Sequence, residues 1–431
     1  MSIAFIVFLV IFVLIFLLKM PIPLGLLAAC TFYFLISGAN TRLVAQTMLA
    51  TLNGNYIVMA IPLYIFSANI MNNGTITERI FDFSKGIVGR FRGGLAHVNV
   101  LASLIFSGMT GSAVADAAGL GKLEIEAMRK EGYDDGFSCA VTAASATIGP
   151  IFPPSIPIII FSTISGASVG ALFMGGMIPG ILLAVALMIF VALISTKRKY
   201  PRAPVKDIKA YLVNSFRSIP AILTPVILLI GIYTGVMTPT EAGAVAGLYA
   251  LIISVFAYKV LKWKAFKELL IDTIKTSGIV CLMIGAAPVM SYVVAKEQIA
   301  TRLSEWILTI SSNPMLFLLF VNIFLLILGM VLSTSVIQLV VLPLLIPTAI
   351  AMGIDMVHFG ILTTFNIMVG LSTPPYGMLL FVTSGISDTP LKKVIKEIIW
   401  PTIAAIAVLA IITYIPDIVL FLPRVLLGYN G

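Results

Sequence analysis

The residues best suited to bind ions lie in two short polar stretches inside long apolar segments. The first stretch, SGMTGS, places three hydroxyl groups and two glycines within residues 107–112. The second stretch, GMVLSTS, places three hydroxyl groups after a glycine within residues 329–335. Inside membranes, hydroxyl oxygens and free helix C-termini coordinate cations, whereas helix N-termini face anions. The two stretches therefore predict the tips of two broken helical segments that bind small ions.

Each polar stretch has a proline-rich partner in the next apolar segment. TIGPIFPPSIP contains the Pro-Pro pair at 153–154, and GLSTPPYG contains the other Pro-Pro pair at 374–375. A continuous helix does not accommodate so many prolines, so both segments must unwind and expose carbonyl groups. A tip facing a break in each half predicts two cation sites with a substrate cavity between them. We expect cation contacts from Ser107, Gly108, Ser145, Gly149, Pro150, Gly329, Ser333, Gly370 and Thr373, and substrate contacts from Thr110, Ser112, Pro154, Ser155, Thr334, Ser335, Pro375 and Tyr376.

A plain packing role is the alternative for these residues. Gly, Ser and Thr let membrane helices approach closely, and proline kinks are ordinary in such helices. In both halves, however, a Gly-Met pair precedes a Pro-Pro pair by the same 45 residues. This repetition of tip and kink together favours binding sites over packing alone.

The composition is that of an integral membrane protein. The chain has 431 residues, of which 60% are hydrophobic and 10% charged, with a mean hydropathy of +1.10. A soluble fold of this size needs more polar surface. The first apolar run lacks the basic start and small-residue cleavage site of a secretory signal, so we interpret it as a retained span. Ten full spans are predicted near 2–18, 21–37, 55–72, 137–166, 169–195, 219–237, 242–259, 276–295, 358–385 and 398–422.

The basic residues sort onto one side of the membrane if two apolar segments, 95–118 and 314–347, enter and leave on the same side. With these two re-entrant hairpins, 23 of the 27 Lys and Arg residues fall on one side. Cytoplasmic loops carry the Lys and Arg excess, so this side is predicted to be the cytoplasm. Both chain termini are then periplasmic. Treating either broken segment as a single crossing would destroy the sorting.

The two halves of the chain resemble each other. Gly108-Met109 recurs as Gly329-Met330, and the two Pro-Pro pairs are separated by the same 221 residues. Each half contributes five spans and one hairpin, and because five is odd the second copy is inverted. Inverted repeats with broken helices near the midplane are typical of secondary transporters. The predicted organisation is a first repeat over 1–195 with its unwound span at 137–166, a basic cytoplasmic connector over 196–218, and a second repeat over 219–431 with its unwound span at 358–385.

Disulfide bonds, metal sites and enzymatic activity find little support in the sequence. Cys30, Cys139 and Cys281 are far apart in apolar surroundings, and with two histidines they predict neither a disulfide framework nor a metal site. No HExxH, GxSxG or P-loop motif occurs, so we expect no enzymatic activity and no organic cofactor. Transport without a nucleotide site would use an ion gradient. Asp116 has two interpretations, a functional carboxylate inside the membrane or a cap or ion-pair partner near the cytoplasmic mouth, and its place just past the tip favours the second.

The stretch SGMTGSAVADAAGLGKLEIEAMRKEGYDDGFSCAVTAASATIGPIFPPSIP, together with GVMTPTEAGAVAG and GLSTPPYGMLLFV, resembles the large membrane subunit of tripartite ATP-independent periplasmic (TRAP) transporters. The resemblance covers essentially the whole chain. It implies a sodium-driven importer of small organic anions in a bacterial inner membrane, with an elevator mechanism. It also implies two partners, a periplasmic solute-binding protein and a separate small four-helix membrane subunit. The family's sodium sites correspond to Ser107, Ser145, Gly149, Gly329, Gly370 and Thr373.

One position departs from the family pattern. Many members have an aspartate in a Gly-Met-x-x-Asp pattern where this chain has Ser333. A substrate contact by a carboxylate is therefore not transferred to this position. Sialic acid, C4-dicarboxylates, sugar acids, keto acids and sulfonates all stay candidate substrates. A stand-alone ion-coupled anion carrier and, as a different class, a channel are the alternative functions.

Overall fold

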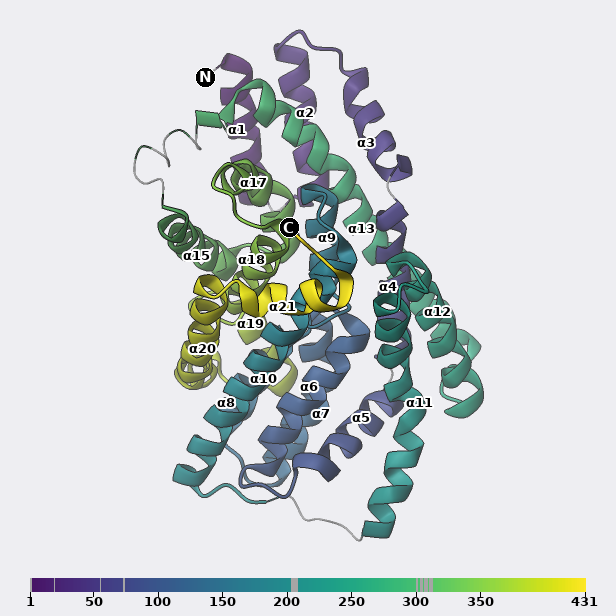
Figure 1. Cartoon of the computed structure of the whole chain (residues 1–431). Coiled ribbons are helices and arrows are strands. Elements are labelled where there is room, and N and C mark those ends of the chain that lie inside the picture. The colour runs from purple at the N-terminus through teal and green to yellow at the C-terminus, as the bar shows by residue number, and fades with distance from the viewer. Residues whose placement is uncertain are drawn as a thin grey trace.

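A computed structural model describes residues 2–431 except 19, 55, 73, 203–207, 300, 303–304, 306–308 and 310–312. Every regular element in this part of the chain is helical, which confirms the expected all-α membrane fold (Figure 1). Up to residue 198 the α-helices are α1 (Ile3–Leu17), α2 (Ile22–Ile36), α3 (Arg42–Gly54), α4 (Tyr56–Met71), α5 (Gly74–Val88), α6 (Gly94–Thr110), α7 (Ala113–Lys130), α8 (Asp135–Ser145), α9 (Ile156–Ser165) and α10 (Val169–Arg198).

Part of the predicted connector belongs to a long helix, with which the rest of the chain begins. Helix α11 starts at Ile208, inside the range 196–218, of which residues 203–207 lie outside the described part of the chain. The helices from here on are α11 (Ile208–Tyr233), α12 (Pro239–Ile252), α13 (Trp263–Lys296), α15 (Pro314–Val331), α16 (Thr334–Val336), α17 (Leu342–Ala351), α18 (Met356–Leu371), α19 (Met378–Ser387), α20 (Leu391–Tyr414) and α21 (Asp417–Leu427).

Both proline-rich segments are broken helices, as predicted. In the first, α8 passes into a single 3-10 turn, Ala146–Ile148, and the chain is non-helical until α9 begins. In the second, α18 ends at Leu371 and α19 begins at Met378. Proline lacks the N–H that an α-helix needs, so the helix cannot continue through either Pro-Pro pair. Both Pro-Pro bonds are cis.

The first hairpin is longer than predicted. Helices α6 and α7 form its two arms, and the second arm runs to Lys130 instead of ending near residue 118. The reason is that one face of α7 stays buried beyond the polar residue Lys122, through Ile125 and Met128. The turn itself lies where the sequence placed it, since Gly111 adopts a left-handed φ of 57° and the Ser112 side chain caps α7.

The second hairpin is also longer, and the last predicted span is shorter. The second arm comprises α16, a π-turn (Ile337–Val341) and α17, and it continues past Pro347 to Ala351. The span predicted over 398–422 ends at Tyr414, and α21 follows as a separate helix. Pro416 explains the break, because proline disfavours a helical conformation of the residue before it.

Two amphipathic helices were missed by the search for long apolar runs. Helix α3 carries no fully buried residue, and α5 alternates charged residues with the buried Ile76 and Ile80. Helix α5 packs against α6, α7 and α11. It therefore lies beside the first hairpin, in a region that the sequence analysis left without an element.

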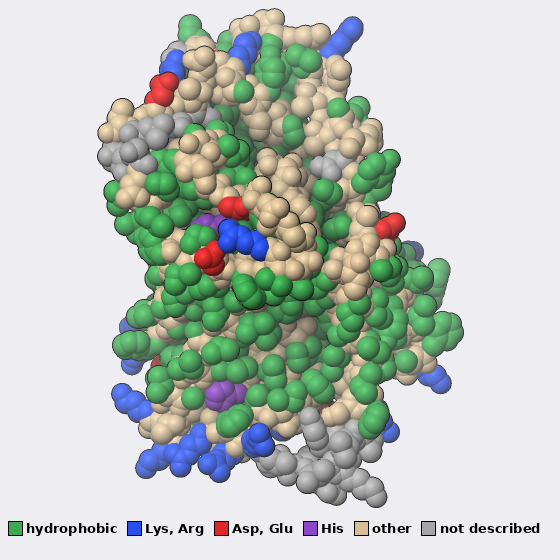
Figure 2. All heavy atoms as spheres, viewed as in Figure 1, with side chains coloured by type: hydrophobic (Ala, Val, Ile, Leu, Met, Phe, Trp, Pro, Cys, Tyr) green, Lys and Arg blue, Asp and Glu red, His purple; other side chains and the backbone are tan. Residues whose placement is uncertain are grey.

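The apolar lengths agree with a multi-pass membrane protein. Among the described residues, seven helical stretches are long and apolar enough to cross a membrane, and α1 and α2 are shorter apolar helices. On the face shown in Figure 2, hydrophobic side chains cover the middle of the molecule and Lys and Arg gather along its lower edge. The predicted total of ten full spans stays a prediction.

The helices pack in two sets. In one set, α2 packs against α1 and α13, α13 against α3 and α4, and α12 against α4 and α11. In the other set, α7 packs against α6, α8 and α19, while α8 and α10 pack against α20 and α15 packs against α18. Both hairpins and both broken helices belong to the second set, so all of the predicted site residues lie in one body of helices.

Candidate ion and anion site

The tip of the first hairpin is seated directly on the first helix break. A Cβ atom on Gly111 would lie 2.6 Å from the carbonyl oxygen of Pro154 and 3.0 Å from the Cα of Ser155. A Cβ atom on Gly149 would lie 3.6 Å from the carbonyl of Ser112. Glycine is needed at position 111, where two backbones approach this closely and φ is positive, whereas the contact at Gly149 is an ordinary van der Waals distance. The C-terminal end of α6 thus meets the N-terminal end of α9. The N-terminal end of α7 meets the end of the 3-10 turn that follows α8.

The hydroxyl groups around this junction are oriented by local hydrogen bonds. Ser107 Oγ donates to the carbonyl of Leu104 at 2.5 Å, and Ser155 Oγ donates to the carbonyl of Pro150. Ser155 also caps α9, since its oxygen accepts a hydrogen bond from the N–H of Ile158 at 3.2 Å. A hydroxyl that donates to a nearby carbonyl keeps oxygen lone pairs with which to coordinate a cation.

The second hairpin meets the second break by close contact of two glycines. A Cβ atom on Gly329 would lie 3.1 Å from Gly370 Cα, and one on Gly370 would lie 2.7 Å from Gly329 Cα. In the broken segment, Thr373 Oγ1 donates to the carbonyl of Val369 at 2.6 Å. Gly377 closes the turn, because a Cβ atom there would lie 2.7 Å from the carbonyl of Thr373. Tip and break are brought together in this half as well.

An open pocket of about 480 Å³ lies beside the second tip. Of the predicted residues it includes Gly329, Ser333 and Tyr376, but not Thr334, Ser335 or Pro375. Tyr376 is 63% exposed. The residues lining the pocket are Gly329, Met330, Val331, Leu332, Ser333, Leu371, Tyr376, Met378 and Phe381.

The two tips differ in exposure. At the first tip and break, Ser107, Ser145 and Ser155 are buried, and Thr110 is 2% exposed. None of these residues lines the pocket at the second tip. Each tip therefore contacts its own break. The pocket at the second tip is lined by the second half alone, so it is not the predicted cavity between the two halves.

The two halves are nevertheless interleaved. The second arm of the first hairpin, α7, packs against α19 of the second broken helix. In return, the second arm of the second hairpin, with α16, the π-turn and α17, packs against α9 of the first broken helix. Each hairpin therefore contacts its own break through its tip and the break of the other half through its arm.

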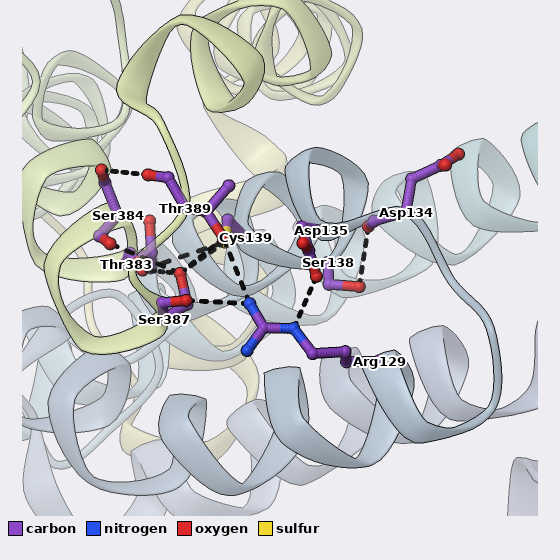
Figure 3. A network of polar contacts seen from close by, with 9 residues as sticks. All are labelled: Arg129, Asp134, Asp135, Ser138, Cys139, Thr383, Ser384, Ser387 and Thr389. Carbon is purple, nitrogen blue, oxygen red and sulfur yellow. Dashed lines mark hydrogen bonds and ion pairs between the residues drawn. The ribbon is translucent and has the colours of Figure 1, made fainter.

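A polar network joins the first hairpin to the second broken helix (Figure 3). Arg129, near the end of α7, donates from Nη2 to the carbonyl of Ser387 at 2.8 Å and from Nε to Asp135 at 2.6 Å. Cys139 Sγ lies 3.1 Å from Ser387 Oγ. Because Ser387 is the last residue of α19, the guanidinium lies at the negative end of that helix. No motif in the sequence predicts this network, because it joins residues 129–139 to residues more than 240 positions later.

Side-chain amides connect each hairpin arm to the broken helix that it faces. In the first half, Ser145 Oγ donates to Asn99 Oδ1 at 2.7 Å, and Asn99 Nδ2 donates to Thr142 at 2.7 Å. In the second half, Asn366 Nδ2 donates to both the carbonyl and Oδ1 of Asn322 at 2.9 Å. Ser145 is thus engaged in a structural bond. The isolated Asn322 in an apolar run was the one signal in the sequence that could have revealed the second contact.

The favoured interpretation of Asp116 does not hold. Ser112 caps α7 instead, and neither Asp116 carboxylate oxygen has a hydrogen-bond partner among the described residues. The two carboxylate oxygens of Glu124, two turns further along the same helix, also have no hydrogen-bond partner among the described residues.

Comparison with known proteins agrees with this arrangement. The family model described as "Tripartite ATP-independent periplasmic transporter, DctM component" matches residues 7–418. The sialic acid TRAP transporter large permease protein SiaM of Vibrio cholerae is 42% identical, over 95% of this chain and 96% of the relative. The sialic acid TRAP transporter permease protein SiaT of Haemophilus influenzae is 40% identical, over 97% of this chain and 68% of the relative.

More distant relatives differ in the substrate that they are named for. The isethionate TRAP transporter permease protein DctMQ of Oleidesulfovibrio alaskensis is 34% identical, over 93% of this chain and 63% of the relative. The fold is similar to that of the YdaH transporter of Alcanivorax borkumensis, with a TM-score of 0.56 and 15% identity over 86% of this chain and 88% of the other. With the family model matched from residue 7 to 418 and a full-length relative at 42% identity, this chain belongs to the TRAP transporter family, as a large membrane permease subunit.

Proposed function

We propose that this permease imports a small organic anion together with sodium ions, which bind where each hairpin tip meets its helix break. The observation that carries the proposal is the repeated junction of tip and break, at Gly111 with Pro154 and at Gly329 with Gly370. Each junction gathers helix ends and hydroxyl oxygens inside a body of apolar helices. Such broken helices provide ion and anion sites in secondary transporters.

An inverted repeat is part of the proposal, and the helix boundaries support it. Helices α6, α7 and α8 begin about 221 residues before α15, α16 and α18, respectively. One side-chain bond recurs with a spacing of 222 residues. Ser162 Oγ donates to the carbonyl of Ala167, and Ser384 Oγ donates to the carbonyl of Thr389, both at 2.6 Å.

The proposed orientation places the basic edge of the molecule in the cytoplasm and both termini in the periplasm. The start of α6 and the ends of α7 and α10 lie together, because Gly93 N–H and Tyr133 Oη both donate to the carbonyl of Pro201. The last turns of α7 and α10 each carry two basic residues. An excess of Lys and Arg is typical of cytoplasmic loops.

Sialic acid is the first substrate to test, because the permeases named above for sialic acid are 42% and 40% identical to this chain. C4-dicarboxylates and isethionate are the next candidates, since relatives at 34% identity are named for them. We expect the substrate to arrive from a periplasmic binding protein, with a small membrane subunit as the second partner.

Reconstitution into lipid vesicles tests the proposal. The permease and its small subunit are given labelled sialic acid with or without the cognate binding protein, and with sodium or potassium outside. Uptake that requires both the binding protein and sodium supports the proposal. Uptake without the binding protein indicates a stand-alone carrier, and ion currents far above carrier turnover indicate a channel.

A further inference from the structure

Two acidic side chains are buried inside the first hairpin. Asp116 is 1% exposed and Glu124 is 0% exposed, and both belong to α7. None of their four carboxylate oxygens has a hydrogen-bond partner among the described residues. The two residues are eight positions apart on α7, which is about 12 Å along the helix axis.

No side chain on the helices packed against α7 forms an ion pair with Asp116 or Glu124 in the described part of the chain. Helix α7 packs against α5, α6, α8, α19 and the 3-10 turn after α8. Asp135 is engaged by Arg129, and Cys139 is engaged by Ser387. In the described part of the chain, none of the four ion pairs involves Asp116 or Glu124. The ionisable side chains on these packed elements are Glu78, Arg79, Asp82 and Lys85 of α5, His97 of α6, and Asp135 and Cys139 of α8.

Two fully buried negative charges without partners are not stable together. Burying an ionised carboxylate without compensation is so costly that the group takes up a proton instead. A metal ion is a poorer solution here, because the described residues contain no group of three or more His, Cys, Asp or Glu side chains that would hold one.

The two positions on α7 are not equivalent. Asp116 is in the first turn, where the helix dipole stabilises a negative charge. Glu124 lies in the middle of the 18-residue helix, beyond the reach of the N-terminal dipole, and has no such support.

We propose that Glu124 is a proton-binding site inside the first hairpin, with Asp116 as the ionised member of the pair. Glu124 is not one of the residues predicted to bind sodium. The proton that it binds affects the hairpin whichever anion is transported. Loss of the proton at alkaline pH would place a second uncompensated charge in the hairpin interior. Uptake should therefore fall as the pH rises.

Infrared spectroscopy of the intact permease complex in lipid tests this assignment. A protonated carboxylic acid gives a C=O stretch well separated from that of a carboxylate. We expect this band in the wild-type protein at neutral pH, and its loss in Glu124→Gln. The band should stay in Asp116→Asn and in Glu126→Gln, an exposed glutamate on the same helix.

Labelling the glutamate carboxyl carbon with ¹³C in the wild-type protein should shift the band, which tests the assignment even if Glu124→Gln fails to fold. Glu124→Gln should keep uptake at pH 7 within about twofold of the wild type, since one neutral hydrogen-bonding group replaces another, and should lose the alkaline decline. A wild-type protein without the band overturns the proposal. So does a band that survives in Glu124→Gln, or one that shifts only with labelled aspartate.

Discussion

Ser107 lies in the last turn of α6, and Thr373 lies two residues beyond the end of α18, so both are close to a helix C-terminus at a junction. Each hydroxyl donates to a carbonyl of the preceding turn, so its oxygen is held in place with lone pairs available. The sequence suggested both residues from their type and spacing alone. Their role as sodium ligands stays a prediction, which single substitutions can test.

We expect Ser107→Ala and Thr373→Ala to raise the half-saturating sodium concentration about tenfold each, which corresponds to about 1.4 kcal/mol of lost binding energy. The measurement is sodium-dependent uptake by the reconstituted complex. Thr363→Ala is the matched control, because Thr363 makes the same kind of bond to the carbonyl of Phe359 within α18, away from the break. Unchanged sodium activation in both test variants would contradict the site assignment.

The contact between Gly329 and Gly370 leaves no room for side chains. We expect Gly370→Ala to destabilise the protein by about 1–3 kcal/mol through overpacking, and Gly329→Ala to be milder, because its Cβ would meet the partner at 3.1 Å rather than 2.7 Å. Thermal unfolding of the purified protein measures both effects.

The control for the glycine series is Gly385→Ala in α19, where an added Cβ would meet nothing within 4 Å. Alanine has the higher helix propensity, so this variant should be as stable as the wild type or slightly more so. Equal unfolding temperatures for all three alanine variants would show that the two helices can separate without loss.

At the scale of helices, the ends of broken segments need partners because their terminal carbonyls are unpaired. Helix α19 ends at Ser387, and Asp388 adopts a left-handed φ of 53° as its C-cap. Arg129 of the first hairpin supplies the positive charge at this end (Figure 3). The side chain is 43% exposed, so solvent weakens its ion pair with Asp135.

We expect Arg129→Gln to loosen α19 and to lower the free energy of unfolding by about 0.5–1.5 kcal/mol, the range of a typical hydrogen bond. Hydrogen–deuterium exchange should become faster in peptides covering 378–389. Lys130→Gln removes a neighbouring exposed charge and should leave exchange in this segment unchanged. If both variants exchange alike, the guanidinium does not hold the helix end.

At the scale of the whole molecule, the helices pack in two sets that contact each other. The hairpins and broken helices belong to one set, and α4 belongs to the other. The two sets touch at several places, one of which is Gly119 of α7 against Asn72, directly after α4, since a Cβ on Gly119 would lie 1.9 Å from Asn72 Oδ1. The elevator movement itself stays a prediction.

Two disulfides can test the elevator movement. Oxidised Asn72→Cys/Gly119→Cys, made without the native cysteines, joins the two sets, and we expect it to abolish uptake until it is reduced. Ser387→Cys can form a disulfide with Cys139 within one set, because Cys139 Sγ lies 3.1 Å from Ser387 Oγ in the wild type and disulfides need only small separations. Since this bond does not join the two sets, the variant should keep more than about half of the uptake. Uptake that continues in the oxidised 72–119 variant would contradict a sliding movement of the two sets.

The sequence alone predicted the membrane class, the two helix breaks and the two tips. Those features depend on local properties: apolar length, the missing N–H of proline, and the left-handed conformation that glycine allows at position 111. It failed at the second arms of both hairpins and at α21, where the helix ends depend on burial against neighbours or on a single proline.

Which elements contact each other depends on the three-dimensional packing of the helices. The Asn99 and Asn322 contacts, the Arg129 network and the burial of Glu124 all join segments that are distant in the chain or hidden by packing. A buried polar group must be paired or neutralised by the group that lies beside it in the fold. Helix packing, rather than spacing along the chain, sets which group that is.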